Sequence, residues 1–130
     1  MEAAAGSRIL VVGHERCLRE LLRIHLRNAG YEVDTAEDAV AALKTMLRQP
    51  PGLVIVDIDM PYVNGLDFVS TLKADPDVAH IPVVFLTERD DMEDAAGKAG
   101  GVSCLKTPLF ADRLLSAVAD ILPTGQFSFG

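Results

Sequence analysis

Three short runs of apolar residues constrain the fold of this chain more than any other feature of its sequence. They span residues 9–12, 53–56 and 83–86, and each is continuous and rich in valine, isoleucine and leucine. Such runs are typical of strands that are buried on both faces, as in a parallel sheet with helices on each side. Residues 31–35 alternate more regularly and favour an edge strand, and residues 102–105 form a shorter fifth candidate.

Apolar residues recur at helical spacing in the segments between these runs. Val40, Leu43 and Leu47 mark one helix, and the two prolines that follow stop it. Asn64 is a suitable N-cap for the next helix, and residues 92–98 predict a short one. The stripe of the first predicted helix comprises Leu18, Leu21, Leu22, Leu26 and Ala29, and that of the last comprises Leu114, Leu115, Val118, Ile121 and Leu122.

Five strands that alternate with five helices predict a doubly wound α/β domain. Parallel strands need helical crossovers, and in this class the helices lie on both faces of the sheet. The chain has 130 residues, which suits one domain of this kind, and we place it at residues 8–122. We expect residues 1–7 to be an N-terminal tail and residues 123–130 to be a C-terminal tail or the start of a linker.

The charge balance excludes some partners. The chain has 19 acidic against 12 basic residues and a net charge of −7, so it has no basic stripe for nucleic acid or for an anionic membrane. No apolar run is long enough to span a membrane, and we expect no secretory signal because residues 1–7 lack its charged start and apolar stretch. Cys17 and Cys104 match no metal or redox spacing, which is typical of reduced thiols. We therefore expect a cytoplasmic location.

Ligands of doubly wound sheets bind at the carboxyl ends of the strands, near the switch in strand order. The candidate site residues are consequently those that follow the apolar runs. They are Gly13, His14 and Glu15 after the first run, Asp57 and Asp59 after the run at 53–56, Thr87 and Glu88 after the run at 83–86, and Lys106 and Thr107 after the last.

The residues around Asp57 resemble the receiver domain of two-component response regulators. The most specific segment is 54–61, an apolar strand that ends in Asp57 and continues to Met60 and Pro61, with Gly65 opening the next helix. Further matches before the last helix are Ala99, Gly100, Leu105 and Pro108. The resemblance covers about residues 8–122, and it implies a flavodoxin-like fold with five parallel strands in the order 2-1-3-4-5 and five helices.

The resemblance also implies a chemistry. In typical members an Asp takes a phosphoryl group from a histidine kinase, and two acids after the first strand hold the cofactor Mg²⁺. A hydroxyl after the fourth strand and a lysine after the fifth bind the phosphoryl group, and an aromatic residue on the fifth strand changes rotamer. By position, Asp57 is the phosphoacceptor and Thr87 is the hydroxyl residue that takes part in the switch.

The metal ligands depart from the family pattern. Gly13 and His14 stand where the family has its two acids, and we expect the side chain of Glu15, offset by one residue, to point elsewhere. Asp59 could join Asp57 as a weak metal ligand, or it is an exposed loop carboxylate. Protonated His14 could pair with Asp57 in place of the cation, or it is a solvated loop histidine. The Mg²⁺ site is therefore predicted to be degenerate.

The phosphoryl-binding and switch positions depart as well. Glu88 would repel an incoming phosphate. Thr107 occupies the usual lysine position, and Lys106 lies one residue early, which on a strand directs its side chain to the opposite face unless the chain bends to recover it. Cys104 occupies the position of the switching aromatic and is expected to be a buried small apolar residue.

These departures favour an atypical, pseudo-receiver-like module that acts through protein–protein interaction, with Mg²⁺-dependent phosphorylation of Asp57 weakened or absent. The alternative is an ordinary receiver that a histidine kinase phosphorylates on Asp57. A small enzyme on the same fold is the third hypothesis, but no nucleophile–base pattern supports it, and we do not expect an enzyme. The expected partners are a histidine kinase or another signalling protein, and the fourth helix, fifth strand and fifth helix form the expected surface for a homodimer or partner.

Overall fold

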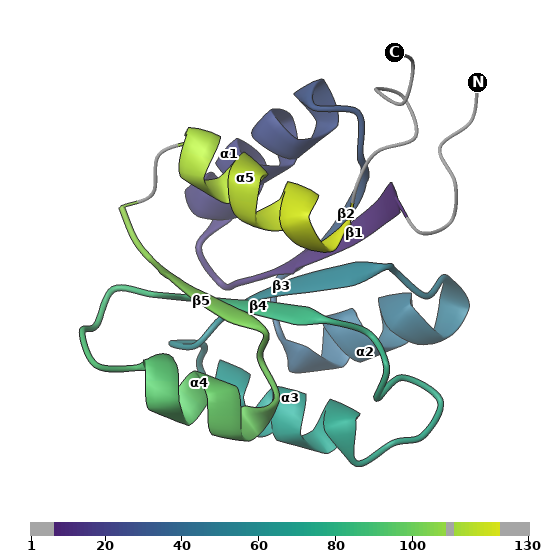
Figure 1. Ribbon diagram of the computed structural model, residues 1–130. Helices are drawn as coiled ribbons and strands as arrows, with labels where there is room; N and C mark the ends of the chain where they lie inside the picture. The colour runs from purple at the N-terminus through teal and green to yellow at the C-terminus, as the bar shows by residue number, and fades with distance from the viewer. Residues whose placement is uncertain (1–6, 109–110, 123–130) are drawn as a thin grey trace.

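The computed structural model describes residues 7–108 and 111–122, and these residues form five strands and five helices in alternation (Figure 1). The strands are β1 (Arg8–Val12), β2 (Glu32–Ala36), β3 (Leu53–Asp57), β4 (Val83–Thr87) and β5 (Ser103–Lys106). The helices are α1 (Arg16–Asn28), α2 (Ala39–Arg48), α3 (Gly65–Lys73), α4 (Glu93–Ala99) and α5 (Ala111–Ile121). Within these described ranges, no helix combines the length and the apolar character needed to cross a bilayer.

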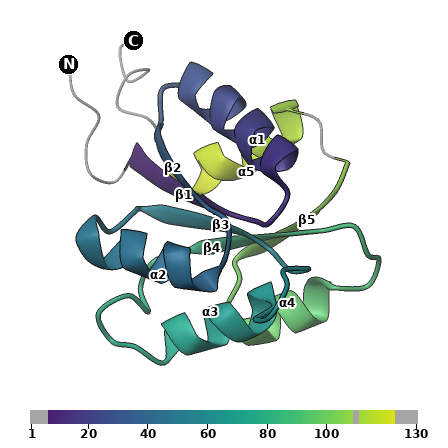
Figure 2. The same cartoon turned by 180° about the vertical axis from the view of Figure 1, so that it is seen from behind.

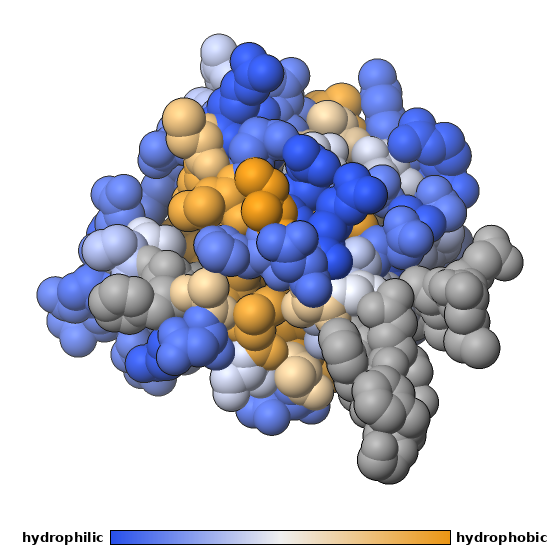
Figure 3. All heavy atoms as spheres, turned by 90° about the horizontal axis from the view of Figure 1, so that it is seen from above, coloured by the Kyte–Doolittle hydropathy of each residue, from blue (hydrophilic) through white to orange (hydrophobic). Residues whose placement is uncertain are grey.

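The strands form one parallel sheet in the order β2-β1-β3-β4-β5, which confirms the predicted fold class. β2 lies at one edge, as its alternating pattern predicted. Helices α1 and α5 cover one face of the sheet, and α2, α3 and α4 cover the other (Figures 1 and 2). Apolar and hydrophilic side chains are interspersed on the face formed by α1 and α5 (Figure 3).

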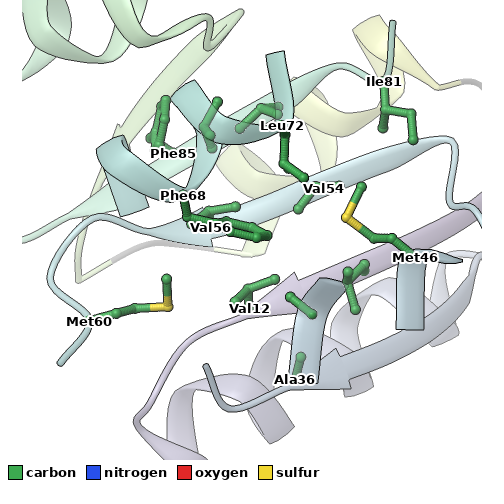
Figure 4. Close-up of a cluster of buried hydrophobic side chains, with 14 of the residues drawn as sticks. Val12, Ala36, Met46, Val54, Val56, Met60, Phe68, Leu72, Ile81 and Phe85 are labelled. Carbon is green, nitrogen blue, oxygen red and sulfur yellow. The ribbon is translucent and has the colours of Figure 1, made fainter. Parts of the chain in front are cut away.

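Two apolar clusters hold these layers together, one on each face of the sheet. The larger one joins the sheet to α2, α3 and α4, and Figure 4 shows Met46 of α2 and Phe68 of α3 beside Val54 and Val56 of β3. Every residue of β3 and β4 is buried, as their continuous apolar runs predicted. Burying one such side chain contributes about 1.5–3 kcal/mol, so the two clusters fix the strands whose ends carry the candidate site.

Local signals at the helix starts position the loops around that site. Asn64 caps α3 as predicted, and its side-chain oxygen accepts a hydrogen bond from the Asp67 amide at 2.9 Å. At Gly65, a Cβ would lie 2.5 Å from the backbone carbonyl oxygen of Asp57. Glycine therefore lets α3 begin directly beside the end of β3.

The stripe that predicted α2 faces solvent instead of the sheet. Val40 is 64% exposed, Leu43 is 38% exposed and Leu47 is 66% exposed, whereas Ala42 and Met46 are fully buried. The helix packs on β1 and β2 through this buried pair, and the residues of the stripe remain outside. Leu21 of the predicted α1 stripe is likewise half exposed, and the buried residues of that helix are Leu22 and Leu26.

Candidate functional site

The carboxyl ends of the strands surround a hollow of about 400 Å³, the position predicted for the ligand site. It is lined by His14, Glu15, Leu18, Asp57, Asp59, Leu86, Thr87, Glu88, Arg89 and Thr107. The structure therefore brings together most of the predicted site residues. It leaves out Gly13, Lys106 and Cys104, and it adds the charged residue Arg89, which the sequence analysis missed.

Asp57 ends β3 and is largely buried at the floor of the hollow. Its Oδ1 atom accepts a hydrogen bond from the Asp59 amide at 2.9 Å. Burial raises the pKa of the Asp57 carboxyl, the charges of Asp59 and Glu15 add to this rise, and the amide hydrogen bond and His14 oppose it. The carboxylate is thus held by one oxygen and is less acidic than an exposed aspartate.

His14 lies beside this carboxylate without bonding to it. Its Nδ1 atom is 3.9 Å from Oδ2 of Asp57, and its side chain is 43% exposed. That distance is too long for a hydrogen bond, so a protonated imidazole here acts on Asp57 only as a nearby charge. The geometry therefore places the two groups as a loose pair, and it also leaves the imidazole solvated.

Glu15 differs from the expectation that its side chain points away, because it lines the hollow. It is the N-cap residue of α1, and its backbone is extended, with φ −81° and ψ 113°. The turn from β1 into the helix therefore breaks the strand alternation on which the expectation rested. Its side chain caps no helix amide.

The two positions after β1 that carry acids in the family offer no carboxylate here. Mg²⁺ requires oxygen ligands in near-octahedral geometry, whereas Gly13 offers no side chain and His14 offers a nitrogen. The carboxylate of Asp59 is already bound by Arg89. Nowhere in the part of the chain that the structure describes do three histidine, cysteine, aspartate or glutamate side chains gather to hold a metal.

Arg89 brings a permanent positive charge to the rim of the hollow. Its Nη2 atom lies 2.9 Å from Oδ1 of Asp59, and its amide donates a hydrogen bond to Oγ1 of Thr87 at 3.0 Å. The ion pair therefore joins the loop after β3 to the loop after β4. The only sequence signal for it is a basic residue two places beyond the strand end, opposite in charge to Asp59.

The two threonines border the hollow, and the neighbouring lysine does not. Thr87 is 3% exposed, and its backbone carbonyl accepts a hydrogen bond from the Thr107 amide at 2.8 Å. Lys106 instead pairs through Nζ with Oδ1 of Asp90, and this hydrogen bond raises the pKa of the lysine. The chain does not bend to recover Lys106, so its amine remains displaced from Asp57.

Cys104 lies on β5 and packs against the larger apolar cluster. Burial raises the pKa of its thiol, and the charge of Glu93 adds to this rise. Together with Glu93 it lines a second hollow of about 270 Å³ between α4 and β5. Cys104 is therefore a small side chain that is partly and not fully buried, and it has no ring that could change rotamer.

Comparison with known proteins gives the family. Residues 9–119 match the model of the response regulator receiver domain. Response regulator MprA of Mycobacterium leprae is 36% identical over 117 residues, which cover 88% of this chain and 50% of that protein. The MprA protein of Mycobacterium ulcerans is also 36% identical over 117 residues, with the same coverage. The chain thus spans about half the length of the curated relatives it matches.

Solved structures agree with the fold. The chemotaxis protein CheY4 of Vibrio cholerae superposes with a TM-score of 0.83 at 26% identity, over 88% of this chain and 98% of that one. A response regulator receiver protein from Pseudomonas putida superposes with a TM-score of 0.80 at 28% identity, over 87% of this chain and 95% of that one. With its strand order, the position of Asp57 and these matches, the chain belongs to the response regulator receiver domain family of two-component signalling.

Proposed function

We propose that this receiver is atypical, with a degenerate phosphorylation site, and that it acts through protein–protein contact while Mg²⁺-dependent phosphorylation of Asp57 is weakened or absent. Receiver domains in general bind Mg²⁺ at the phosphorylation site and interact with histidine kinases and other signalling proteins. The observation that carries the proposal is the replacement of both metal-binding acids after β1 by Gly13 and His14.

The charges around Asp57 support this proposal. Glu15, Asp59 and Glu88 line the hollow with it, while the amine of Lys106 pairs with Asp90 outside. An incoming phosphoryl group therefore meets carboxylates without the metal that would offset their repulsion. Arg89 is the permanent cation of the lining, and its charge is shared with Asp59.

An ordinary phosphoacceptor receiver is the second candidate, and the position of Asp57 favours it. The carboxylate stands at the carboxyl end of the buried strand β3, with the buried residue Thr87 at the end of the neighbouring strand. One oxygen of Asp57 is fixed by the Asp59 amide, and the other is free of that bond. Such a carboxylate could accept a phosphoryl group from a histidine kinase.

The partners that we propose are a histidine kinase or another signalling protein, and a homodimer or partner contact through the face of α4, β5 and α5. Val102, 60% exposed beside the hollow between α4 and β5, supports an interface there. The net charge of −7 supports a domain that does not itself bind nucleic acid or an anionic membrane. Two free cysteines support a cytoplasmic location. We also propose that the chain does not turn over a small-molecule substrate.

Thermal unfolding with Mg²⁺ and the phosphoryl mimic beryllofluoride tests the proposal. The wild type and Asp57→Asn are measured in parallel, with an ordinary receiver that has both acids as the positive control. A ligand that binds only the folded state, at 100 times its Kd, adds about 2.7 kcal/mol. We expect no rise in Tm for either form of this chain. A rise in the wild type that Asp57→Asn abolishes would support the ordinary phosphoacceptor instead.

A further inference from the structure

Helix α2 presents a continuous apolar stripe to solvent. The stripe consists of Val40, Leu43 and Leu47, whose spacings of three and four residues place them on one side of the helix. This is the spacing of the seam between two packed helices. Single exposed apolar residues are ordinary, but a contiguous apolar strip on a helix marks an interaction surface.

The exposure of this stripe is built into the fold. Asp38 caps the start of α2 by accepting a hydrogen bond from the Ala41 amide at 2.8 Å. Ala42 and Met46 then hold the neighbouring side of the helix against β1 and β2. Figure 2 shows α2 at the end of the row of helices that it forms with α3 and α4. The outward side of α2 is therefore held in place with no neighbouring element on it in the described residues.

Two cations flank the stripe on one side. Lys44 and Arg48 each follow a stripe leucine by one residue, which places both about 100° further around the helix. Both are exposed, and within residues 7–108 and 111–122 no ion pair involves either of them. In a chain of net charge −7, this local basic flank is complementary to acidic residues on whatever covers the stripe.

From this combination we infer that α2 docks an amphipathic helix of a partner protein, with acidic residues beside its apolar stripe. Charges that flank an apolar seam select the partner and its orientation. A second copy paired antiparallel would set Lys44 and Arg48 against the same two cations, which repel. An anionic membrane would be repelled by the net charge of the domain. This surface lies apart from Asp57, so the inference does not depend on the proposed function.

The test uses two synthetic helical peptides and the isotope-labelled chain in solution. Both peptides carry leucine at the seam positions, and one has glutamate and the other lysine at the flanking positions. We expect the glutamate peptide to shift the amide resonances of α2 and to bind at least about tenfold more tightly than the lysine peptide. No binding of the glutamate peptide, equal binding of both peptides, or shifts centred on another element would overturn the inference.

Matched variants distinguish peptide binding at this surface from nonspecific hydrophobic binding. Leu43→Gln/Leu47→Gln is expected to weaken binding of the glutamate peptide at least about tenfold. The control Leu21→Gln/Ile24→Gln changes residues of α1 that are 51% and 48% exposed, and it should leave binding unchanged. Because all four side chains are exposed, both variants should unfold near the wild-type temperature.

Charge reversal and two further probes complete the experiment. Lys44→Glu/Arg48→Glu should exchange the preference between the two peptides. Self-association that Leu43→Gln/Leu47→Gln abolishes, measured by light scattering, would assign the stripe to a second copy and overturn the inference. Binding to vesicles of anionic lipid without binding to the glutamate peptide would also overturn it. None of these readouts involves Asp57. The peptide experiments can therefore fail while the beryllofluoride result holds, and the beryllofluoride result can fail while the peptide experiments hold.

Discussion

Restoring the two acids after β1 tests whether their loss disables the site. The double variant Gly13→Asp/His14→Asp places carboxylates at the two positions where the family has them, and the structure can accommodate them. A Cβ at position 13 would meet its nearest heavy atom, Cβ of Asp57, at 3.5 Å, an ordinary contact. Gly13 is not among the glycines with a positive φ, so a side chain causes no backbone strain there.

The double variant should be less stable than the wild type without ligands, and it should gain stability when Mg²⁺ and beryllofluoride are added. Two added carboxylates beside Asp57 should destabilise the metal-free domain, since unit charges about 4 Å apart repel by about 1 kcal/mol in water and about 4 kcal/mol at an effective dielectric constant of 20. With Mg²⁺ and beryllofluoride at 100 times their Kd, binding should add about 2.7 kcal/mol. For a domain of this size that corresponds to a rise in Tm on the order of 10 °C.

Calorimetric melts of four proteins, with and without Mg²⁺ and beryllofluoride, give the answer. They are the wild type, the double variant, the double variant combined with Asp57→Asn, and Gly13→Asn/His14→Asn, which has the same shape without the charge. Only the double variant with Asp57 intact should gain stability from the ligands. A folded double variant without a Mg²⁺-dependent rise would refute the reasoning, because the missing acids would then not be what disables the site.

Three further predictions concern the same end of the sheet. Burial raises the pKa of Asp57 in the folded domain above its ordinary value of 3.8, so folding favours the protonated form and stability falls as pH rises from the ordinary pKa through the folded one. Chemical unfolding at several pH values should therefore show Asp57→Asn more stable than the wild type at pH 7, with the difference vanishing below about pH 3.8. Gly65→Ala should cost about 1–3 kcal/mol because the added Cβ would clash with the Asp57 carbonyl. Gly97→Ala, whose Cβ would have nothing within 4 Å, should stabilise α4 by about 0.5–1 kcal/mol. Equal effects of the two variants in urea titrations would argue against the close approach of Gly65 to the end of β3. Arg89→Ala breaks a half-exposed ion pair and should cost no more than about 1 kcal/mol, so a larger loss in the same titration would mean that Arg89 does more than pair with Asp59.

The sequence predicted the sheet and the location of the site because burial determines both. Strands covered on two faces must be continuously apolar, and the ends of parallel strands meet at one edge, so Asp57 and Thr87 could be placed together before the structure was known. The side-chain partners in the loops could not be predicted in this way. Arg89 reaches Asp59 only because the loops after β4 and β3 lie side by side, which no local pattern records.

Helix α2 shows a second limit. Its apolar stripe predicted a helix correctly, but periodicity does not say which side the sheet covers. The fold buries Ala42 and Met46 and leaves Val40, Leu43 and Leu47 exposed, so the stripe that predicted the helix is not its inward side. An apolar stripe that the sheet covers and one that remains exposed to solvent have the same sequence pattern.

The strand order has a consequence for how the chain folds. β1 pairs with both β2 and β3, so three of the five strands are complete by residue 57, before β4 begins at residue 83. The first half of the domain therefore contains three adjacent strands and the two helices that connect them. On the ribosome, that half would emerge as a three-stranded template onto which β4 and β5 add in turn.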